Sequence, residues 1–431
     1  MRKGVILVLL CVGIALLFLM IPGQVAASTT WHVDDSGGAD FTTIQDAVNA
    51  SNDGDTIVVK DGTYIENVDV NKSLTIGSEN GSGSTLVQPA EQGKDIFKVT
   101  ADYVNISGFT VNGLGPLTYD PDAVGEAISD GIDIYHSCHC TIAGNTVLGC
   151  AYGIHLQLAP NNTVLNNNCS GNRDHAIKLD LSSENTISHN ICRGTWHDDN
   201  IDLTSSSNNT ISDNICIEGS DDGIFLAGSS NNRVLNNTCE NNAEIGIHLV
   251  GPSNIISNNT ISINSSRTLQ GGIQLPSNTT VIYNTITYTA YNVTYNIETL
   301  GNGGISVYEN NKIYLNNNLD NVWDHSHTNN IWNSTEPIEY AYNGNTYENY
   351  LGNYWATYTG NDSDGNGIGD SPYHIEGTQY DYHPLMTPFE SYFHLTTLWG
   401  PYITSTTTDS TTINWRSEER RVGKEGRSRW S

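Results

Sequence analysis

A repeat of about 23 residues is the feature that most constrains how this chain can fold. The repeated motif occurs as DGIDI, YGIHL, HAIKL, DNIDL, DGIFL, IGIHL, GGIQL and GGISV. Its central residues are Ile132, Ile154, Ile177, Ile201, Ile224, Ile247, Ile273 and Ile305, and the first six intervals are 22, 23, 24, 23, 23 and 26 residues. Short alternating strands between Gly- and Asn-rich turns, at so short a period, predict one coil of a parallel β-helix per repeat.

Two further columns follow from the same period. A second apolar position (Val164, Ile187, Ile211, Val234) is followed three residues later by Asn167, Asn190, Asn214 or Asn237. We expect these amides to stack along the solenoid as a structural ladder. Five residues after the apolar position stand Cys169, Cys192, Cys216 and Cys239, and Ile261 and Ile286 continue the column. An inward stack of free thiols is expected; disulfides, or a thiolate row for Cu(I), are the alternatives.

The two ends of the chain differ from the rest. Arg2 and Lys3 precede an apolar run and a small-residue site ending at Ala27, which predicts a secretory signal over 1–27, with an uncleaved anchor as the alternative. Residues 416–431 contain six basic and three acidic residues and resemble a translated sequencing adapter, so we interpret them as an artefact. Leaving out both ends removes eight of the 18 basic and three of the 47 acidic residues. The remaining acidic chain argues against a nucleic-acid binder and against membrane insertion after signal cleavage.

Several segments of the chain resemble known protein families. DDSGGADFTTIQDAVNASNDGDTIVVKDGTYIENVDVNKSLTI resembles the N-terminal cap and first coil of secreted right-handed β-helix proteins, with Phe41, Ile44, Ala47 and Val48 at helical spacing. The repeats are similar to the carbohydrate-binding and sugar-hydrolase β-helix superfamily that includes NosD, a periplasmic protein of copper-site maturation. Residues 351–386 resemble the closing motif of NosD-like proteins, and GPYITSTTTDSTTINW resembles the first strands of a fibronectin type III-like domain.

These resemblances imply an all-β chain: a right-handed, pectate-lyase-like parallel β-helix with an N-terminal capping helix and a truncated fibronectin type III-like segment. The expected boundaries are 28–111 for the cap and first coils, 112–349 for the remaining coils, 350–393 for the closing segment and 396–415 for the truncated domain.

A candidate ligand groove lies on one turn of the coils. The residues before each Gly-Ile form acidic columns, and bases and aromatics stand close by in the sequence: Asp174, His175, Asp198, Asp199, Asp221, Asp222, Glu244, His155, Lys178, Asp202, His248, Arg173, Trp196 and His197. Two insertions in the same turn, 112–130 and 287–303, bring Tyr119, Tyr288, Tyr291 and Tyr295 to either side. Crowded carboxylates raise one another's pKa or recruit a cation, and either property suits saccharide binding or chemistry. A merely solvated acidic turn is the alternative.

An enzymatic resemblance centres on the same turn. HDDNID (197–202) and SDDGI (220–224) are similar to the N-T-D and D-D motifs of polygalacturonases. The resemblance implies catalytic roles for Asp199, Asp221 and Asp222, with an acid and a base about 6.5–9.5 Å apart. The family's G-H-G and R-I-K motifs are absent, and for lyase chemistry Arg173 is the only candidate base.

Three other features suggest bound ions or modification. D-S-D-G-N-G-I-G-D matches Ca²⁺ loops of the EF-hand and thrombospondin type 3 kind, with Asp362, Asp364, Asn366, Ile368 and Asp370 as ligands, although a solvated turn has the same composition. His136, Cys138, His139, Cys140 and Cys150 could form a disulfide or a mixed metal site. About fourteen N-x-S/T sequons, including Asn49, Asn208 and Asn333, fit a glycosylated surface.

Taken together, the sequence predicts a secreted or cell-surface protein, with an archaeal envelope among the candidate locations. It is expected to bind a glycan or cell-surface polysaccharide, either as a monomer or as part of a larger multidomain protein. A polysaccharide hydrolase or lyase and a copper-handling NosD-like protein are the alternative functions.

Overall fold

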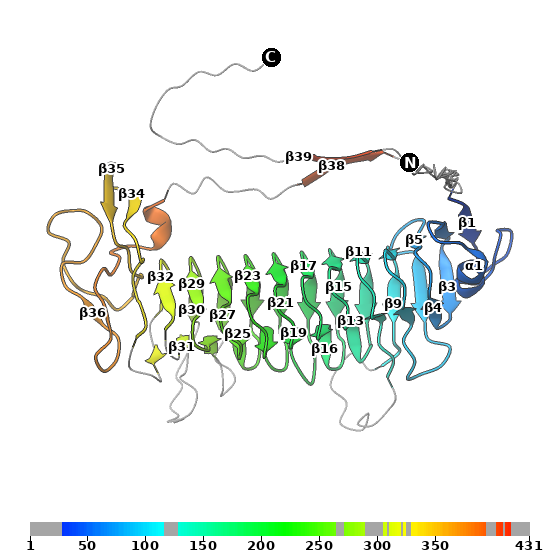
Figure 1. Ribbon diagram of the computed structural model, residues 1–431, viewed down its shortest axis with the longest axis horizontal. Helices are drawn as coiled ribbons and strands as arrows, with labels where there is room; N and C mark the ends of the chain where they lie inside the picture. The colour runs from blue at the N-terminus through cyan, green and yellow to red at the C-terminus, as the bar shows by residue number, and fades with distance from the viewer. Residues whose placement is uncertain are drawn as a thin grey trace, which may run out of the picture.

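The computed structural model describes residues 28–115, 128–263, 271–288, 305–307, 310–319, 322–324, 329–393, 402–407 and 410–414. Three long sheets, which we name A, B and C, are built from parallel strands, and from β2 to β32 each sheet takes every third strand in chain order. The chain therefore passes from A to B to C and back, one coil at a time, along a rod-like body (Figure 1). The expected all-β parallel β-helix is confirmed.

The sheets differ slightly in strand number. Sheet A has 12 strands: β1 Thr30–Val33, β2 Thr56–Val59, β5 Thr75–Ser78, β8 Asn105–Ser107, β11 Thr141–Ala143, β14 Thr163–Leu165, β17 Thr186–Ser188, β20 Thr210–Ser212, β23 Arg233–Leu235, β26 Ile255–Ser257, β29 Thr280–Ile282 and β32 Lys312–Tyr314. Sheet B has 10: β3 Gly62–Ile65, β6 Thr85–Gln88, β9 Thr110–Asn112, β12 Thr146–Leu148, β15 Asn168–Ser170, β18 Ile191–Arg193, β21 Ile215–Ile217, β24 Thr238–Glu240, β27 Thr260–Ile263 and β30 Thr285–Tyr288. Sheet C has 11: β4 Val68–Val70, β7 Phe97–Val99, β10 Ile132–Tyr135, β13 Tyr152–Gln157, β16 His175–Asp180, β19 Ile201–Thr204, β22 Ile224–Ala227, β25 Ile245–Leu249, β28 Gly271–Leu275, β31 Ile305–Val307 and β33 Trp323–Asp324.

The repeat positions coincide with the register of the sheets. Ile132 pairs with Ile154, Ile154 with Ile177 and Ile177 with Ile201 in sheet C, and these side chains are fully buried. In sheet B the register joins Cys169 to Cys192, Cys216 and Cys239 in turn, and all four side chains are 0% exposed. We call these four the thiol column. None of the described cysteines forms a disulfide, as expected for thiols that serve as small core side chains.

Asparagine ladders run along two of the three corners. At the turn from A to B, each Asn Oδ1 accepts the backbone N–H of the equivalent Asn one coil earlier; Asn214 Oδ1 accepts from Asn190 N, and Asn237 Oδ1 from Asn214 N, both at 3.0 Å. This is the predicted ladder. A second ladder at the turn from C to A, which the sequence reasoning missed, contains Asn162, Asn185, Asn209, Asn232 and Asn254.

The described ends of the solenoid differ from its middle. Helix α1 (Ile44–Ala50) lies beside the first strands; Thr43 caps its start, and its buried residues are Ile44, Ala47 and Val48 (Figure 1). Phe41 precedes the helix, so the expected helical stripe is shorter by one residue. Whether α1 acts as a cap stays a prediction.

The closing segment packs around a smaller apolar cluster than the coils do. It contains two antiparallel pairs, β34 (Ile338–Tyr342) with β35 (Asn345–Asn349) and β36 (Tyr373–His374) with β37 (Tyr380–Asp381), and the short 3₁₀ helix η2 (Phe389–Ser391). The buried cluster is Leu315, Tyr340, Leu351, Ile368, Leu385, Phe389 and Tyr392. Further on, β38 (Tyr402–Thr407) and β39 (Ser410–Asn414) form an antiparallel pair, whose identity as a fibronectin type III-like start is untested.

Several expectations fall outside the described residues. These are the signal peptide, the tail over 416–431, Tyr119, Tyr291, Tyr295 and the side chain of Tyr288. Within the part of the chain that the structure describes, no helix is long and apolar enough to cross a membrane.

Candidate functional site: an acidic surface at the turn from B to C

The candidate site begins with a row of polar side chains on the outer face of sheet C. Register partners place Asp133, His155, Lys178 and Asp202 side by side on consecutive coils, and the row continues to Phe225 and His248. Strand alternation turns these side chains away from the core because their neighbours in each strand point inward. The first four are nevertheless buried, so ion pairs within the row are shielded from solvent.

Hydrogen bonds connect the row to both of its sides. His155 lies between Asp130, 3.3 Å from its Nδ1, and Asp180, 2.9 Å from its Nε2. Burial opposes protonation, but these carboxylates raise the pKa of His155 to about 9. Lys178 Nζ lies 2.6 Å from Asp202 Oδ2. The charges of His155 and Lys178 are therefore already neutralised, by Asp130 and Asp180 for His155 and by Asp202 for Lys178.

Two carboxylates of the neighbouring turn are buried rather than exposed. Asp199 and Asp222 are 2% and 3% exposed. Asp199 Oδ1 accepts the backbone N–H of Asp222 at 2.8 Å, and Asp222 Oδ1 accepts that of Ile245 at 2.8 Å. Asp222 Oδ2 also contacts His248 Nδ1 at 2.7 Å. The alternative of a solvated turn is wrong for these two residues, because both are buried and each accepts a hydrogen bond from the adjacent coil.

Burial changes the protonation of this inner layer. Desolvation, followed by the charges of Asp222 and Asp198, raises the pKa of Asp199 to about 10. Desolvation also raises the pKa of Asp222, against the hydrogen bond from His248. Desolvation lowers the pKa of His175 to about 4, so its imidazole is neutral at pH 7. Asp199 is thus a protonated acid beside a neutral imidazole.

An outer layer is open to solvent. Asp198, Asp221, Glu244 and Asp174 are partly exposed, and His197 is exposed. Burial and the neighbouring Glu244 raise the pKa of Asp221 to about 6. We call the carboxylates of this corner the acidic surface: Asp174, Asp198, Asp199, Asp221, Asp222 and Glu244. Arg173 is paired with Asp174, with Nη2 2.9 Å from Oδ2.

Two overlapping groups of ligand atoms lie within this surface. Single atoms of His175, Asp198 and Asp199 all lie within 4.8 Å of one another, and so do carboxylate oxygens of Asp199, Asp221 and Asp222. Oxygens at about 2.3–2.6 Å from a common Ca²⁺ can be that far apart. The spacing is shorter than the roughly 6.5–9.5 Å that an inverting hydrolase needs between its two carboxyl groups.

Trp196 does not offer the aromatic face that the sequence suggested. Its side chain is 9% exposed, and its Nε1 is buried without a hydrogen-bond partner. Phe225, half-buried and with its ring centroid 4.7 Å from that of His248, is the more accessible aromatic residue of this surface.

The expected cysteine–histidine cluster is not brought together. His136 packs on Tyr135, whereas His139 stacks on Tyr103. The Cys140 and Cys150 side chains are buried, and all the cysteines of this group are free. Cys138, Cys140 and Cys150 are all free thiols, so the disulfide alternative is not formed in this structure.

In the candidate Ca²⁺ loop, aspartate side chains accept hydrogen bonds from backbone N–H groups of the loop itself. Asp362 accepts hydrogen bonds from Asn366 N at 3.0 Å and Gly367 N at 2.8 Å, and Asp370 Oδ2 accepts from Ser363. Asp362 is partly exposed, and Asp364 and Asp370 are exposed. Asp381, the next aspartate along the chain, is fully buried and accepts hydrogen bonds from Asn353, Trp355 and His383, so it adds no ligand to the loop.

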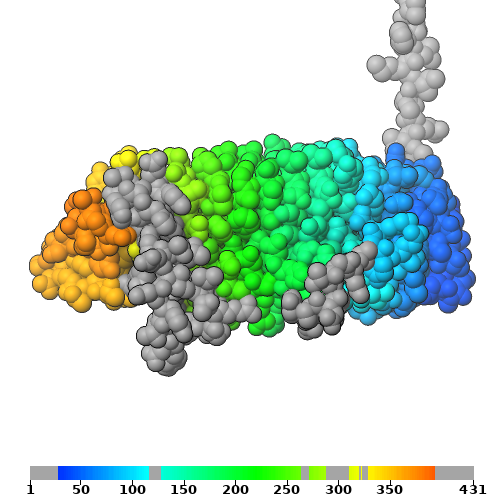
Figure 2. Space-filling view, turned by 90° about the horizontal axis from the view of Figure 1, so that it is seen from below, coloured from blue at the N-terminus to red at the C-terminus, as the bar shows by residue number. Residues whose placement is uncertain are grey.

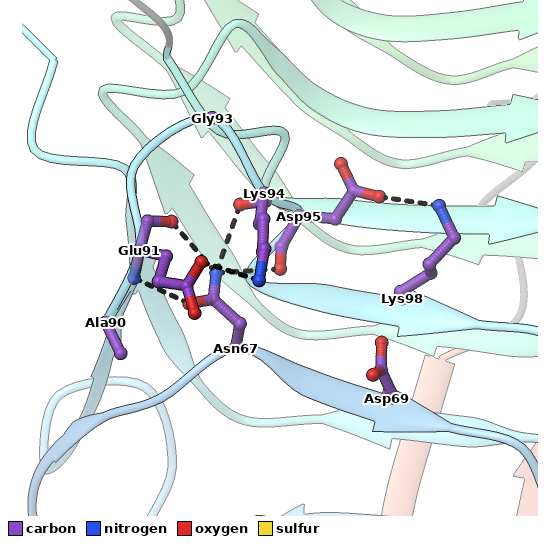
Figure 3. Close-up of a pocket in the computed structure, with 8 residues that line it drawn as sticks. All are labelled: Asn67, Asp69, Ala90, Glu91, Gly93, Lys94, Asp95 and Lys98. Atoms are coloured by element: carbon purple, nitrogen blue, oxygen red, sulfur yellow. Dashed lines mark hydrogen bonds and ion pairs between the residues drawn. The ribbon is translucent and has the colours of Figure 1, made fainter.

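A separate polar cavity of about 430 Å³ lies at the first coils of sheet C (Figure 3). Asn67 Nδ2 donates to backbone carbonyls of the 91–95 loop, and Lys98 pairs with Asp95 at 2.9 Å. Lys98 also lies 3.3 Å from Asp133, which joins this cavity to the sheet C row. No sequence motif marks this cavity, because its lining comes from two consecutive coils, at residues 67–69 and 90–98.

The fold and the acidic surface together define a class of protein: a parallel β-helix with a row of carboxylates along one corner. The chain matches the family model described as "Periplasmic copper-binding protein (NosD)" over residues 48–267 and 192–360. These matches span well over half of the sequence, and the chain belongs to this family.

Relatives and solved structures agree with that assignment. A cell surface glycoprotein of the archaeon Methanothermus fervidus is 31% identical over 149 residues, which are 34% of this chain and 21% of that protein. The structure is similar to the Dettilon tailspike protein, with a TM-score of 0.51 and 15% identity over 67% of this chain and 66% of the other. It is also similar to DFA-IIIase of Arthrobacter chlorophenolicus, with a TM-score of 0.53 and 15% identity over 64% and 76%. At such identities the structural likenesses show the fold alone.

Proposed function

We propose that this chain is an extracytoplasmic β-helix protein that binds carbohydrate through the acidic surface, with a divalent cation between its carboxylates. One observation carries the proposal. At this corner the carboxylates of Asp199 and Asp222 accept backbone hydrogen bonds, whereas the ladders at the other two corners use neutral asparagines for the same kind of bond.

The contrast between aspartate and asparagine matters because burial of a carboxylate costs more free energy than burial of a neutral amide. A buried carboxylate without a cation loses solvation and either takes up a proton or destabilises the fold. Asparagine oxygens accept the same kind of bond at this corner too, since Asn172 accepts from Cys150 N and Asn242 from Gly219 N. The turn itself therefore does not require charge at Asp199 and Asp222, and a ligand that uses the charge explains it.

A hard divalent cation is the ligand that this geometry supports best. Asp199, Asp221 and Asp222 offer three oxygens within reach of one ion, and Asp198 and Glu244 lie at the open side. Ca²⁺ takes six to eight oxygens, so water or sugar hydroxyls would complete its coordination. Hydroxyl pairs of a glycan would replace those waters, and the exposed His197 would face the same solvent side.

The family's copper name has weaker support from the donors present. The thiol column is fully buried; burial raises the pKa of Cys169, Cys192 and Cys216, and a hydrogen bond with Cys216, together with burial, raises that of Cys239, which disfavours the thiolate that Cu(I) binds. Among the described residues, the candidate group with a histidine has one imidazole and two carboxylates, without the sulfur donors that Cu(I) prefers. These residues do not fit a Cu(I) centre.

Hydrolysis is the alternative that the experiment must separate. Asp199 and Asp222 are nearly inaccessible, and one carboxylate oxygen of each already accepts a backbone hydrogen bond, so neither side chain is exposed enough to meet a glycosidic oxygen. A glycan array probed with the protein in Ca²⁺ and in chelator, followed by an assay for released reducing ends on every hit, tests both functions.

The proposal predicts Ca²⁺-dependent array signals without release of reducing ends. The triple variant Asp198→Asn, Asp221→Asn, Glu244→Gln should lose the signals. Glu184→Gln removes an exposed charge at the turn from C to A and should keep them. Signals unchanged in the triple variant would contradict the proposal, and released reducing ends would favour the hydrolase.

A further inference from the structure

We propose that exposed turn asparagines at two corners of the solenoid are N-glycan attachment sites, and that the third corner, with the acidic surface, carries none over its short turns. The inference is independent of the proposed ligand. It rests on where the fold places each sequon, which the sequence alone does not show.

Five sequons occupy one conformation. Asn161, Asn208 and Asn278 lie at the turn from C to A, with φ of 59°, 60° and 60°. Asn236 and Asn258 lie at the turn from A to B, with φ of 55° and 57°. All five side chains are exposed, and each is followed two residues later by a threonine at the start of a strand of sheet A or B. The left-handed conformation suits asparagine and turns the side chain outward from the corner.

The neighbouring ladder explains why only the first Asn of each pair is available. In the N-N-T triplet at 208–210, Asn209 is 0% exposed, and its Oδ1 accepts the backbone N–H of Asn185. The same holds at 236–238, where Asn237 is buried in the other ladder. The fold thus fixes one amide inside and leaves its predecessor in solvent.

Other sequons lie in strands and serve as an internal comparison. Asn168, in β15, is partly buried and accepts a 2.5 Å hydrogen bond from Ser170, the hydroxyl residue of its own sequon. Asn105, in β8, is partly buried and donates to Thr75 Oγ1 at 3.3 Å. Both amides and their flanking backbone are held in a sheet, so we expect little modification there.

The third corner is different. The acidic surface lies on the turns from sheet B to sheet C. Between residues 149 and 246, the described short turns at this corner contain no N-x-S/T sequence. Asn264 and Asn292 belong to sequons outside the described residues. In Figure 2 the body of the solenoid is a continuous rod, so glycans on two corners would shield those edges and leave the acidic surface open to its ligand.

The reaction needs a donor that the proposal names by class: a polyprenyl-phosphate-linked oligosaccharide and an oligosaccharyltransferase. The asparagine Nδ2 bonds to the anomeric carbon, and the bond from that carbon to the phosphate oxygen breaks. The amide loses one proton, and the lipid phosphate departs with the electron pair. No redox change occurs.

Glycopeptide mass spectrometry of the full chain, produced in a host that N-glycosylates exported proteins, tests the proposal. We expect glycan mass at Asn161, Asn208, Asn236, Asn258 and Asn278 and none at Asn105 or Asn168. A control acceptor tag on the same chain reports that the transferase is active. Modification of the strand sites with the turn sites bare, or a modified tag with all five turn sites bare, would overturn it.

A gain-of-site variant makes the test sharper. Asn231 is exposed at the turn from C to A, with φ of 58°, but Arg233 stands where a sequon needs Thr. Arg233→Thr places the residue found at the register partner Thr210 and should add one glycan at Asn231. Asn231→Gln in the unaltered chain should change nothing, whereas Asn208→Gln should remove one glycan. An Arg233→Thr protein without added mass at Asn231, while Asn208 is occupied, would contradict the placement argument.

Discussion

Replacement of Asp199 by asparagine should stabilise the cation-free protein at neutral pH. The Asn side chain keeps an oxygen for the 2.8 Å hydrogen bond from Asp222 N and has nearly the shape of the protonated acid. It removes an ionisable group that is 2% exposed and lies against other carboxylates. The wild type must either hold a proton there or bury a charge, and both cost free energy as the pH rises.

The magnitude follows from the pKa difference. The pKa of Asp199 is about 10 in the folded chain, against an ordinary value of 3.8. Because the folded pKa is the higher one, the proton stabilises the fold fully below pH 3.8, and this stabilisation is lost as the pH rises toward 10. At about 1.36 kcal/mol per pH unit, the penalty at pH 7 amounts to at most about 4 kcal/mol. Asp199→Asn abolishes this dependence.

Urea unfolding of wild type and Asp199→Asn in chelator, between pH 4 and pH 8, checks this reasoning. The variant should be more stable at pH 7 and the difference should shrink toward pH 4, while the control Glu184→Gln stays within about 0.5 kcal/mol of wild type. Ca²⁺ at the 362–370 loop would act equally on both proteins, so saturating Ca²⁺ should stabilise the wild type more than the variant, by about 2.7 kcal/mol at a hundredfold excess over the Kd of the acidic surface, and so narrow or reverse the difference. A variant less stable than wild type at pH 7 in chelator would refute the argument.

Three further predictions concern the fold and the second ion site. Asn237→Ala leaves two buried backbone groups without their amide partner and should lower the free energy of urea unfolding by about 2–6 kcal/mol. Asn236→Gly, at an exposed left-handed position, should change that free energy by less than about 1 kcal/mol. Equal losses in the two variants would contradict the ladder. A thiol reagent applied to the native protein should label Cys138 and leave the thiol column unlabelled, and a disulfide-linked peptide from the column would contradict its burial. Calorimetric titration should show Ca²⁺ binding at the 362–370 loop that Asp364→Asn weakens; no loop-dependent heat at about millimolar Ca²⁺ would remove that site.

The sequence predicted those features that depend on a single coil. The isoleucine positions, the thiol column and the first Asn ladder share one period, and stacking by register necessarily places them over one another. The coil period is enough for such predictions because parallel strands repeat the same geometry in every turn.

The sequence did not predict which side chains of the turn from B to C are buried and which are exposed. Asp198 and Asp199 are adjacent in the sequence, yet one is partly exposed and the other buried, because only Asp199 turns toward the next coil. Trp196 was expected on the surface but lies in the turn interior. The histidines and cysteines near residue 138 are close in sequence, but consecutive residues of a strand or turn point in different directions, so proximity along the chain did not produce a site.

Calorimetric titration with the strongest array glycan tests whether the acidic surface binds carbohydrate. In Ca²⁺, we expect saturable binding at about one glycan per chain that disappears in chelator and in the triple variant Asp198→Asn, Asp221→Asn, Glu244→Gln, and that persists in Glu184→Gln. Binding of equal strength in the triple variant would show that the acidic surface is not the glycan site.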